Sequence, residues 1–402
     1  MNRRSFLYRL GALTLSQGLL GCGSSRDRLT LRIELLKGSI PALMLGRFRE
    51  KLQRNSVHNF ALDFNPQPRL QDLFELLQGW KRRANVPKTP NKPLIPIPFI
   101  AQPPAGASDL VTLGDYWLET AIQQKLIQPL DLSQWQQWQT LPPRWQTLVT
   151  RDLQGNPDPK GQVWAAPYRW GCTMLVYRKD LFEQQGLSLP TDWHDLWRKE
   201  LCGKFSLLDH PREIIGLALK KLGCSYNLPN LQPVPNLKSE LIALNRQTKF
   251  YSSTDYLQPL LLGQTLLAVG WSTDILSAMK RNYKLQAIIP QSGTALWADL
   301  WVRPASAPPP NQAKLLNQWI DFCWQPEIAE QLSLQSHAVS PVFIDRSTSK
   351  LPEPLRKNPL LVCNEETLRN SEFLLPIAKP TLEQHRLLWQ SIRQVVPTSP
   401  SL

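Results

Sequence analysis

The sequence predicts a two-lobed α/β protein. At 402 residues the chain is longer than one ordinary domain, and 42% hydrophobic with 19% charged residues is the composition of a folded globular protein. Short apolar strand patterns alternate with amphipathic helical patterns, which is typical of a parallel β-sheet covered by helices. No internal repeat is visible, and periodicity alone does not show where the chain crosses between the lobes.

The alternation begins with Leu29–Ile33, where apolar and polar residues alternate as in a half-buried strand. Asp109–Leu113 has the apolar run of a buried strand, and Thr191 is the expected N-cap of a helix over 192–200. The other expected strands are 60–64, 174–177, 266–269 and 287–289. The other expected helices are 41–53, 69–83, 116–125, 180–185, 272–280 and 312–324.

An export signal is expected at the start of the chain, over residues 1–22. Three arginines precede the apolar run Leu10–Leu20, which is too short for a stable membrane span. Residues 19–22 resemble a bacterial lipobox, which implies that Cys22 is diacylated and becomes the first residue of a membrane-anchored periplasmic lipoprotein. An amphipathic helix with a chance cysteine is the alternative.

The route of export is left open between two systems. Residues 2–7, Asn-Arg-Arg-Ser-Phe-Leu, resemble the twin-arginine export motif. Basic residues begin export signals of every kind, so the Sec route is the alternative.

The charge is strongly basic but dispersed. The net charge is +14 for the whole chain, and without residues 1–21 the chain carries 43 basic and 32 acidic residues. The densest basic cluster is only Lys81–Arg83, and an exported protein rarely meets nucleic acid. We therefore expect a solvated surface near anionic lipid and no nucleic-acid partner.

The cysteines do not predict a metal site. Five cysteines remain besides Cys22, and none forms a CxxC pair. An odd number leaves at least one free thiol. Either Cys202 bridges Cys224 in the oxidising envelope, or the thiols are free and buried.

No catalytic motif is present. The sequence lacks GxSxG, HExxH, P-loop and GxGxxG patterns, and its five histidines are scattered without metal-ligand spacing. We therefore expect a protein that is not an enzyme and that holds no metal or cofactor.

Tryptophan is unusually frequent, with fifteen in the chain. Trp271 closes the apolar strand 266–270, and Trp297 precedes Asp299 by two residues, so that both point to one side of an extended segment. A flat aromatic face beside a carboxylate suits an organic cation through cation–π attraction and a charge-assisted hydrogen bond. The alternative is that these tryptophans fill the core.

Segments that cover about a third of the chain resemble the bacterial periplasmic spermidine/putrescine-binding proteins. The most specific stretch runs from Thr191-Asp192-Trp193-His194-Asp195-Leu196-Trp197 through 207–213 into the helix 218–223. The resembling segments are 109–128, 166–177, 193–227, 263–271 and 293–332.

The resemblance implies a type II periplasmic-binding-protein fold, in which two lobes close over a ligand. Lobe one is expected over 28–166 and 297–345, and lobe two over 167–296 and 346–402. The hinge strands would then lie near Ala166–Tyr168 and near Trp297.

The resemblance also implies binding residues. Tyr116 matches a tyrosine of the family's cleft, Glu213 a carboxylate for an amine, and Trp271 a tryptophan of the cleft wall. Trp297 and Asp299 match the pair that stacks on and charge-pairs the polyamine.

Other positions depart from the family's pattern. His210 stands where the family has an aspartate, Lys37 falls in a loop that elsewhere carries an aromatic and an acid, and Ala338 replaces a tyrosine. Each lost carboxylate weakens the binding of a polyamine, because a charged hydrogen bond contributes about 1.5–3 kcal/mol. We keep His210 and Lys37 as further candidate cleft residues.

The resemblance implies a monomeric substrate-binding lipoprotein of an ABC importer. It would capture a small organic cation, a polyamine such as putrescine or spermidine, and deliver it to the membrane permease. Two alternatives remain open: the same fold binding a different small organic solute, or a surface-anchored interaction protein whose cleft no longer binds polyamines.

Overall fold

The computed structural model describes residues 29–55, 59–85, 106–307 and 313–394. Cys22 and the rest of the expected export signal lie outside these residues. Within the part of the chain that the structure describes, every helix is too short or too polar to span a bilayer. The same described residues contain no cluster of three or more histidine, cysteine or acidic side chains suited to a metal ion.

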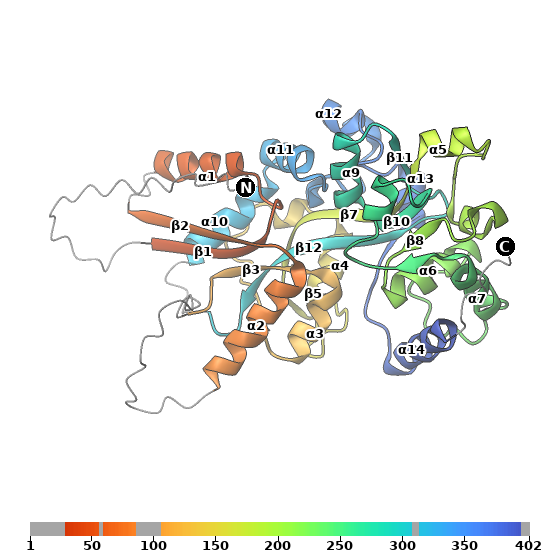
Figure 1. Cartoon of the computed structure of the whole chain (residues 1–402). Helices are drawn as coiled ribbons and strands as arrows, with labels where there is room; N and C mark the ends of the chain where they lie inside the picture. Colours follow the sequence, from red (N-terminus) through yellow and green to blue (C-terminus); the bar gives the residue numbers. More distant parts are fainter. Residues whose placement is uncertain (1–28, 56–58, 86–105, 308–312, 395–402) are drawn as a thin grey trace, which may run out of the picture.

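Helices and strands alternate along the chain, as the sequence predicts (Figure 1). The strands are β1 (Leu29–Leu36), β2 (Phe60–Gln67), β3 (Leu110–Gly114), β4 (Ile127–Gln128), β5 (Thr150–Arg151), β6 (Gln162–Val163), β7 (Ala166–Arg178), β8 (Phe205–Leu207), β9 (Phe250–Tyr251), β10 (Leu267–Trp271), β11 (Leu285–Ile288), β12 (Ala295–Pro304) and β13 (Glu372–Phe373). The α-helices are α1 (Ala42–Arg54), α2 (Leu70–Ala84), α3 (Leu118–Gln123), α4 (Pro143–Val149), α5 (Lys179–Gln184), α6 (Pro211–Lys221), α7 (Leu237–Gln247), α8 (Gln258–Leu261), α9 (Ser272–Arg281), α10 (Ala313–Trp324), α11 (Pro326–Ser336), α12 (Glu353–Arg356), α13 (Glu365–Asn370) and α14 (Lys379–Arg393). Short 3-10 turns are η1 (Asp115–Trp117), η2 (Trp138–Thr140), η3 (Trp193–Trp197), η4 (Lys199–Leu201), η5 (Pro341–Phe343) and η6 (Thr348–Lys350).

Two long antiparallel strands, β7 and β12, connect the two ends of the molecule. Among the described residues the main sheet runs in the order β2-β1-β3-β12-β7-β10-β8-β9. β12 pairs with β3, whereas the second part of β7 pairs with β10 and β11. Figure 1 shows β7 and β12 in the middle of the molecule, between β1–β3 and the group of β8 and β10. Both segments expected as hinge strands, Ala166–Tyr168 and Trp297, lie in this pair; the lobe boundaries themselves stay a prediction.

The buried apolar side chains form two clusters. The larger one contains residues of β1, β3, α1 and α10, together with alternate residues of β7 from Ala166 to Val176 and five residues of β12. The smaller one is built around β8, α6 and α7 and takes its β7 residues from the far end of that strand. All thirteen residues of β7 are buried, because the strand has neighbours on both sides and is covered on both faces.

Two helix predictions are wrong in detail. The expected helix over 116–125 is the 3-10 turn η1 followed by the short helix α3. The expected helix over 192–200 is the pair of turns η3 and η4, interrupted where Arg198 adopts an extended backbone.

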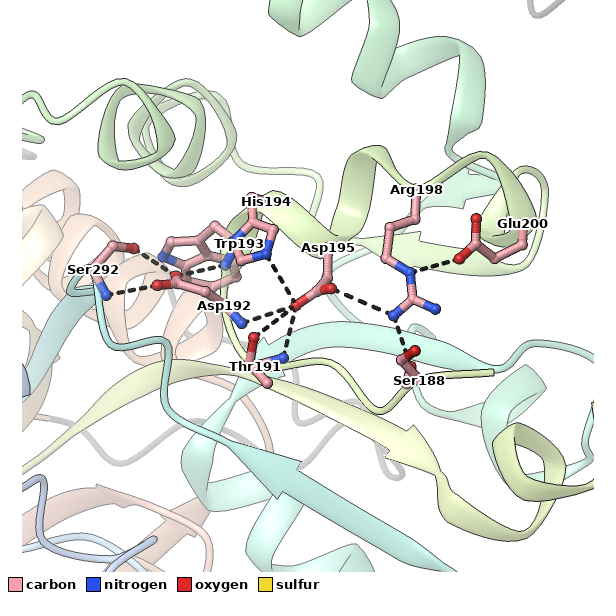
Figure 2. A network of polar contacts seen from close by, with 9 residues as sticks. All are labelled: Ser188, Thr191, Asp192, Trp193, His194, Asp195, Arg198, Glu200 and Ser292. Atoms are coloured by element: carbon pink, nitrogen blue, oxygen red, sulfur yellow. Dashed lines mark hydrogen bonds and ion pairs between the residues drawn. The ribbon is translucent and has the colours of Figure 1, made fainter. Parts of the chain in front are cut away.

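The N-cap of this second segment is Asp192 and not Thr191. The Asp192 carboxylate accepts from the Trp193 amide at 2.6 Å and from the Ser292 amide at 3.0 Å. The Asp195 carboxylate accepts from the Thr191 amide at 2.7 Å (Figure 2). These local hydrogen bonds pair the backbone amides with side-chain carboxylates in tight turns, so the segment does not need the hydrogen bonds of a regular α-helix. They also tie η3 to the loop that leads into β12.

Candidate functional site

One face of β7 organises the residues predicted to bind ligand. Alternate residues of a strand point to the same face, so Arg169, Gly171 and Thr173 form a row. In the register of the sheet, Arg169 lies opposite Asp299, Gly171 opposite Trp297, and Thr173 opposite Trp271. The sheet thus brings together Trp271, Trp297 and Asp299, which are up to 28 positions apart in the sequence.

At one end of this row Asp299 is bonded to Arg169. The guanidinium Nε donates to Asp299 Oδ2 at 2.6 Å, Nη2 forms an ion pair with the same oxygen at 2.6 Å, and the side chains are only 5% and 2% exposed. The guanidinium carbon lies 5.9 Å from the centre of the Trp297 ring. We call these three residues the Asp299 position. Trp297 and Asp299 lie on one side of β12, as their spacing predicts, and the cation that both contact is the chain's own Arg169. Their contact with a ligand stays a prediction.

Burial opposes charge on both members of this pair. It raises the pKa of Asp299, although the guanidinium acts in the opposite direction. Burial alone would lower the pKa of Arg169, but the carboxylate outweighs it and the net direction is upward. Because a guanidinium stays protonated in proteins, we treat the pair as ionised.

Gly171 allows Trp297 to lie close against the strand. A Cβ atom at this glycine would be 2.4 Å from the Trp297 ring and 2.3 Å from Ser272 Oγ. The Trp297 indole N–H donates to the Cys172 carbonyl at 3.4 Å. The ring is therefore held beside the Arg169 guanidinium by the shape of the backbone.

At the other end of the row Glu213 is buried with uncharged partners. It lies in the first turn of α6 and is 5% exposed. Its carboxylate accepts from Thr173 Oγ1 at 2.9 Å and from the Trp271 indole N–H at 3.3 Å. No ion pair to Glu213 is found in the described part of the chain. We call Glu213, Thr173 and Trp271 the Glu213 position.

The electrostatics of Glu213 follow from this environment. Burial raises its pKa to about 7, although the two hydrogen bonds and the neighbouring Arg212 act in the opposite direction. The Arg212 guanidinium itself donates to the carbonyls of Leu375 and Tyr226 and to the Asn227 side chain. Glu213 is therefore a buried carboxylate whose negative charge lacks a bonded counter-ion.

Tyr116 and His210 meet beside the Glu213 position. Their rings pack edge to face, 4.7 Å between centres, and join η1 to the N-terminus of α6. The His210 Nδ1 accepts from the Glu213 amide at 3.4 Å. Burial lowers the pKa of His210 to about 4, with Arg212 acting in the same direction, so the imidazole is neutral at physiological pH.

Lys37 is not part of either position. It lies in the exposed turn after β1, where its amide donates to the Gln67 carbonyl. Within the described chain no contact joins its side chain to Glu213 or Asp299, so its role in binding stays a prediction.

Sequence reasoning missed Arg169, Thr173 and Asp115. Asp115 accepts from the Ala298 amide at 3.0 Å, and burial raises its pKa to about 7. A signal for Arg169 was available, because an arginine inside a long apolar strand needs an acidic partner. The partner could not be read, because Asp299 is 130 positions away.

All five described cysteines are free. The alternative in which Cys202 bridges Cys224 is therefore wrong for this structure, and Cys202 is exposed. Cys172, Cys323 and Cys363 are buried thiols, with 3.9 Å between the sulfurs of Cys172 and Cys363.

Comparison with known proteins decides the family. Residues 107–371 match the family model of the bacterial extracellular solute-binding proteins. The chain belongs to this family. The spermidine/putrescine-binding periplasmic protein of Escherichia coli is 26% identical over 269 residues, which cover 67% of this chain and 72% of the relative. The putrescine/agmatine-binding protein of Pseudomonas aeruginosa is 26% identical over 302 residues, or 71% and 78%.

Solved structures of this kind share the fold. The spermidine/putrescine ABC transporter substrate-binding protein PotD of Streptococcus pneumoniae superposes with a TM-score of 0.71 at 19% identity, covering 90% of this chain and 98% of that one. The TpPotD lipoprotein of Treponema pallidum gives 0.63 at 18% identity, covering 90% and 99%. The chain therefore has the predicted periplasmic-binding-protein fold. Its relatives are transport binding proteins, and this chain is a binding protein and not an enzyme.

Proposed function

We propose that the chain is the substrate-binding lipoprotein of an ABC importer and that it captures a small organic cation at the Glu213 position. Membership of the extracellular solute-binding family supports the general role. The polyamine-binding relatives support the class of ligand, since each is named for an amine that it binds.

The buried carboxylate of Glu213 is the observation that carries the proposal. Its hydrogen-bond donors are a hydroxyl and an indole N–H, which supply no positive charge. A ligand ammonium would supply that charge and form a charge-assisted hydrogen bond. The half-buried Trp271 ring beside it offers cation–π attraction and an apolar surface for methylene groups.

Delivery to the permease would depend on closure around the ligand. Tyr116 and His210 belong to separate elements that meet next to Glu213. A ligand held between these elements would favour the conformation in which they touch, and the permease would recognise that conformation. Cys22 would keep the monomeric protein at the membrane through its lipid.

Isothermal titration calorimetry of the exported protein with small amines tests this function. Glu213→Gln should weaken amine binding ten- to a hundredfold, the loss of one charged hydrogen bond. Glu366→Gln, which changes an exposed glutamate of α13, is the matched control and should bind as the wild type does. Equal affinities of Glu213→Gln and wild type would reject Glu213 as the cation-binding residue, and a wild type that binds no amine would reject the function.

A further inference from the structure

The Asp299 position already contains a cation. The Arg169 guanidinium lies between the Asp299 carboxylate, which it contacts through one hydrogen bond and an ion pair, and the Trp297 ring, whose centre is 5.9 Å away. These are the two kinds of contact that were predicted to hold a cationic nitrogen of the ligand. Arg169 thus satisfies the charge of Asp299 without any ligand.

The charge of Arg169 disfavours a second cation beside this pair. Both side chains are almost completely removed from solvent, and a ligand ammonium close to Arg169 would meet a like charge in a medium of low dielectric constant. Displacing Arg169 would leave a guanidinium without its carboxylate, which is costly for a buried charge. Gly171 adds to the constraint, because it seats the Trp297 ring beside the guanidinium.

The Glu213 position lies too far along β7 for Arg169 to neutralise its carboxylate as well. Glu213 is bonded to Thr173, four residues after Arg169, a separation of roughly 13 Å along a strand. Two acidic positions on the same face of β7 therefore differ: the chain supplies a cation at one and uncharged donors at the other.

We propose that Arg169 is a specificity-determining residue that replaces one cationic nitrogen of the ligand, so that the site prefers a small amine with a single positive charge to a diamine or triamine. This proposal rests on the proposed function, because it assumes that an amine binds at Glu213. Of the family's two contacts for charged nitrogens at Asp299 and Glu213, only that at Glu213 is left for the solute.

Calorimetry with two ligands of equal length tests the proposal. Putrescine carries an amine at each end of four carbons, and 4-amino-1-butanol replaces one amine by a hydroxyl. Wild-type protein should bind 4-amino-1-butanol at least tenfold more tightly than putrescine. In Arg169→Met, which frees Asp299, the ratio of putrescine to 4-amino-1-butanol affinity should rise at least tenfold.

The double variant Arg169→Met/Asp299→Leu is the matched control, because it removes both charges and leaves no buried carboxylate without a partner. It should fold even where Arg169→Met does not, and it should lack the gain in relative putrescine affinity that the single variant shows. A similar gain in the double variant would overturn the role of Arg169, because the gain would then not depend on Asp299.

The two proposals fail in different ways. Wild-type protein that binds putrescine as tightly as 4-amino-1-butanol, or more tightly, overturns the role of Arg169 and leaves the proposed function intact. Wild-type protein that binds neither these amines nor any other overturns the proposed function, and the role of Arg169 with it.

Discussion

Asp299 and Glu213 are two buried carboxylates that face the same row of β7, and they differ in one respect. Asp299 bonds a guanidinium from the neighbouring strand, whereas Glu213 bonds a hydroxyl and an indole. A carboxylate beside a tryptophan is therefore not enough to define a cation site. In our account the cation site is at Glu213, to which the chain supplies a hydroxyl and an indole N–H but no bonded counter-ion.

The largest effect is expected from breaking the ion pair. Asp299→Asn leaves the Arg169 guanidinium buried without a charged partner, which should lower the free energy of unfolding by about 3–5 kcal/mol. Urea denaturation measures this loss. The double variant Arg169→Met/Asp299→Leu should recover most of it; a single variant as stable as wild type would show that the pair is not needed in the folded state.

The second effect concerns pH and the charge of Glu213. Its pKa is raised to about 7 in the folded protein, above the ordinary value of 4.5. The protonated form therefore contributes stability below pH 4.5, and this contribution is lost as the pH rises through 7. Glu213→Gln cannot ionise, so its stability relative to wild type should rise by about 3 kcal/mol between pH 4.5 and pH 8.

Urea denaturation of both proteins across this pH range tests the expectation, with Glu366→Gln as control. Asp115, whose pKa is also raised to about 7, is present in all three proteins and cancels in the difference. A constant difference between Glu213→Gln and wild type would mean that Glu213 does not titrate in this range.

A smaller effect is expected at Gly171. The Cβ atom of Gly171→Ala would clash with the Trp297 ring and with Ser272 Oγ, so stability should fall by about 1–3 kcal/mol, as in other overpacked interiors. Thermal and urea unfolding report the change. Gly46→Ala in α1, where a Cβ meets no atom within 4 Å, should instead be neutral or stabilising by up to about 1 kcal/mol. Equal behaviour of the two variants would contradict the packing of Trp297.

The smallest effect is expected at Tyr116. Its edge-to-face contact with His210 is the kind of aromatic pair that contributes about 0.5–1.5 kcal/mol. Tyr116→Ala should therefore weaken amine binding roughly two- to tenfold in calorimetry. Tyr283→Ala removes a tyrosine that is 90% exposed and should bind like wild type; a Tyr116 variant that does the same would exclude this contact from closure.

The sequence predicted the fold better than it predicted the site. The alternation of strands and helices from Leu29 to Ala84 is nearly as expected, because apolar periodicity is a local property. Prediction failed over 192–200, where Asp192 and Asp195 satisfy the backbone in tight turns. Such competition between side chains and the helix depends on geometry that periodicity does not contain.

At the site, the spacing of residues within one strand predicted which side chains share a face. The partners of these side chains on other strands could not be predicted from the sequence. The i, i+2 relation of Trp297 and Asp299 correctly placed both on one side of β12, where each contacts Arg169. The identity of the cation depended on the register between β7 and β12, two strands that begin 129 positions apart in the sequence. Nothing local in either strand encodes that register.

The accurate mass of the small molecule that copurifies with the protein, measured by native mass spectrometry, tests the central claim most directly. Our account predicts an organic solute with one basic nitrogen, retained by wild-type protein and Glu366→Gln and absent from Glu213→Gln. Putrescine or spermidine in the wild-type protein, or the same solute retained after the loss of the Glu213 carboxylate, would contradict it.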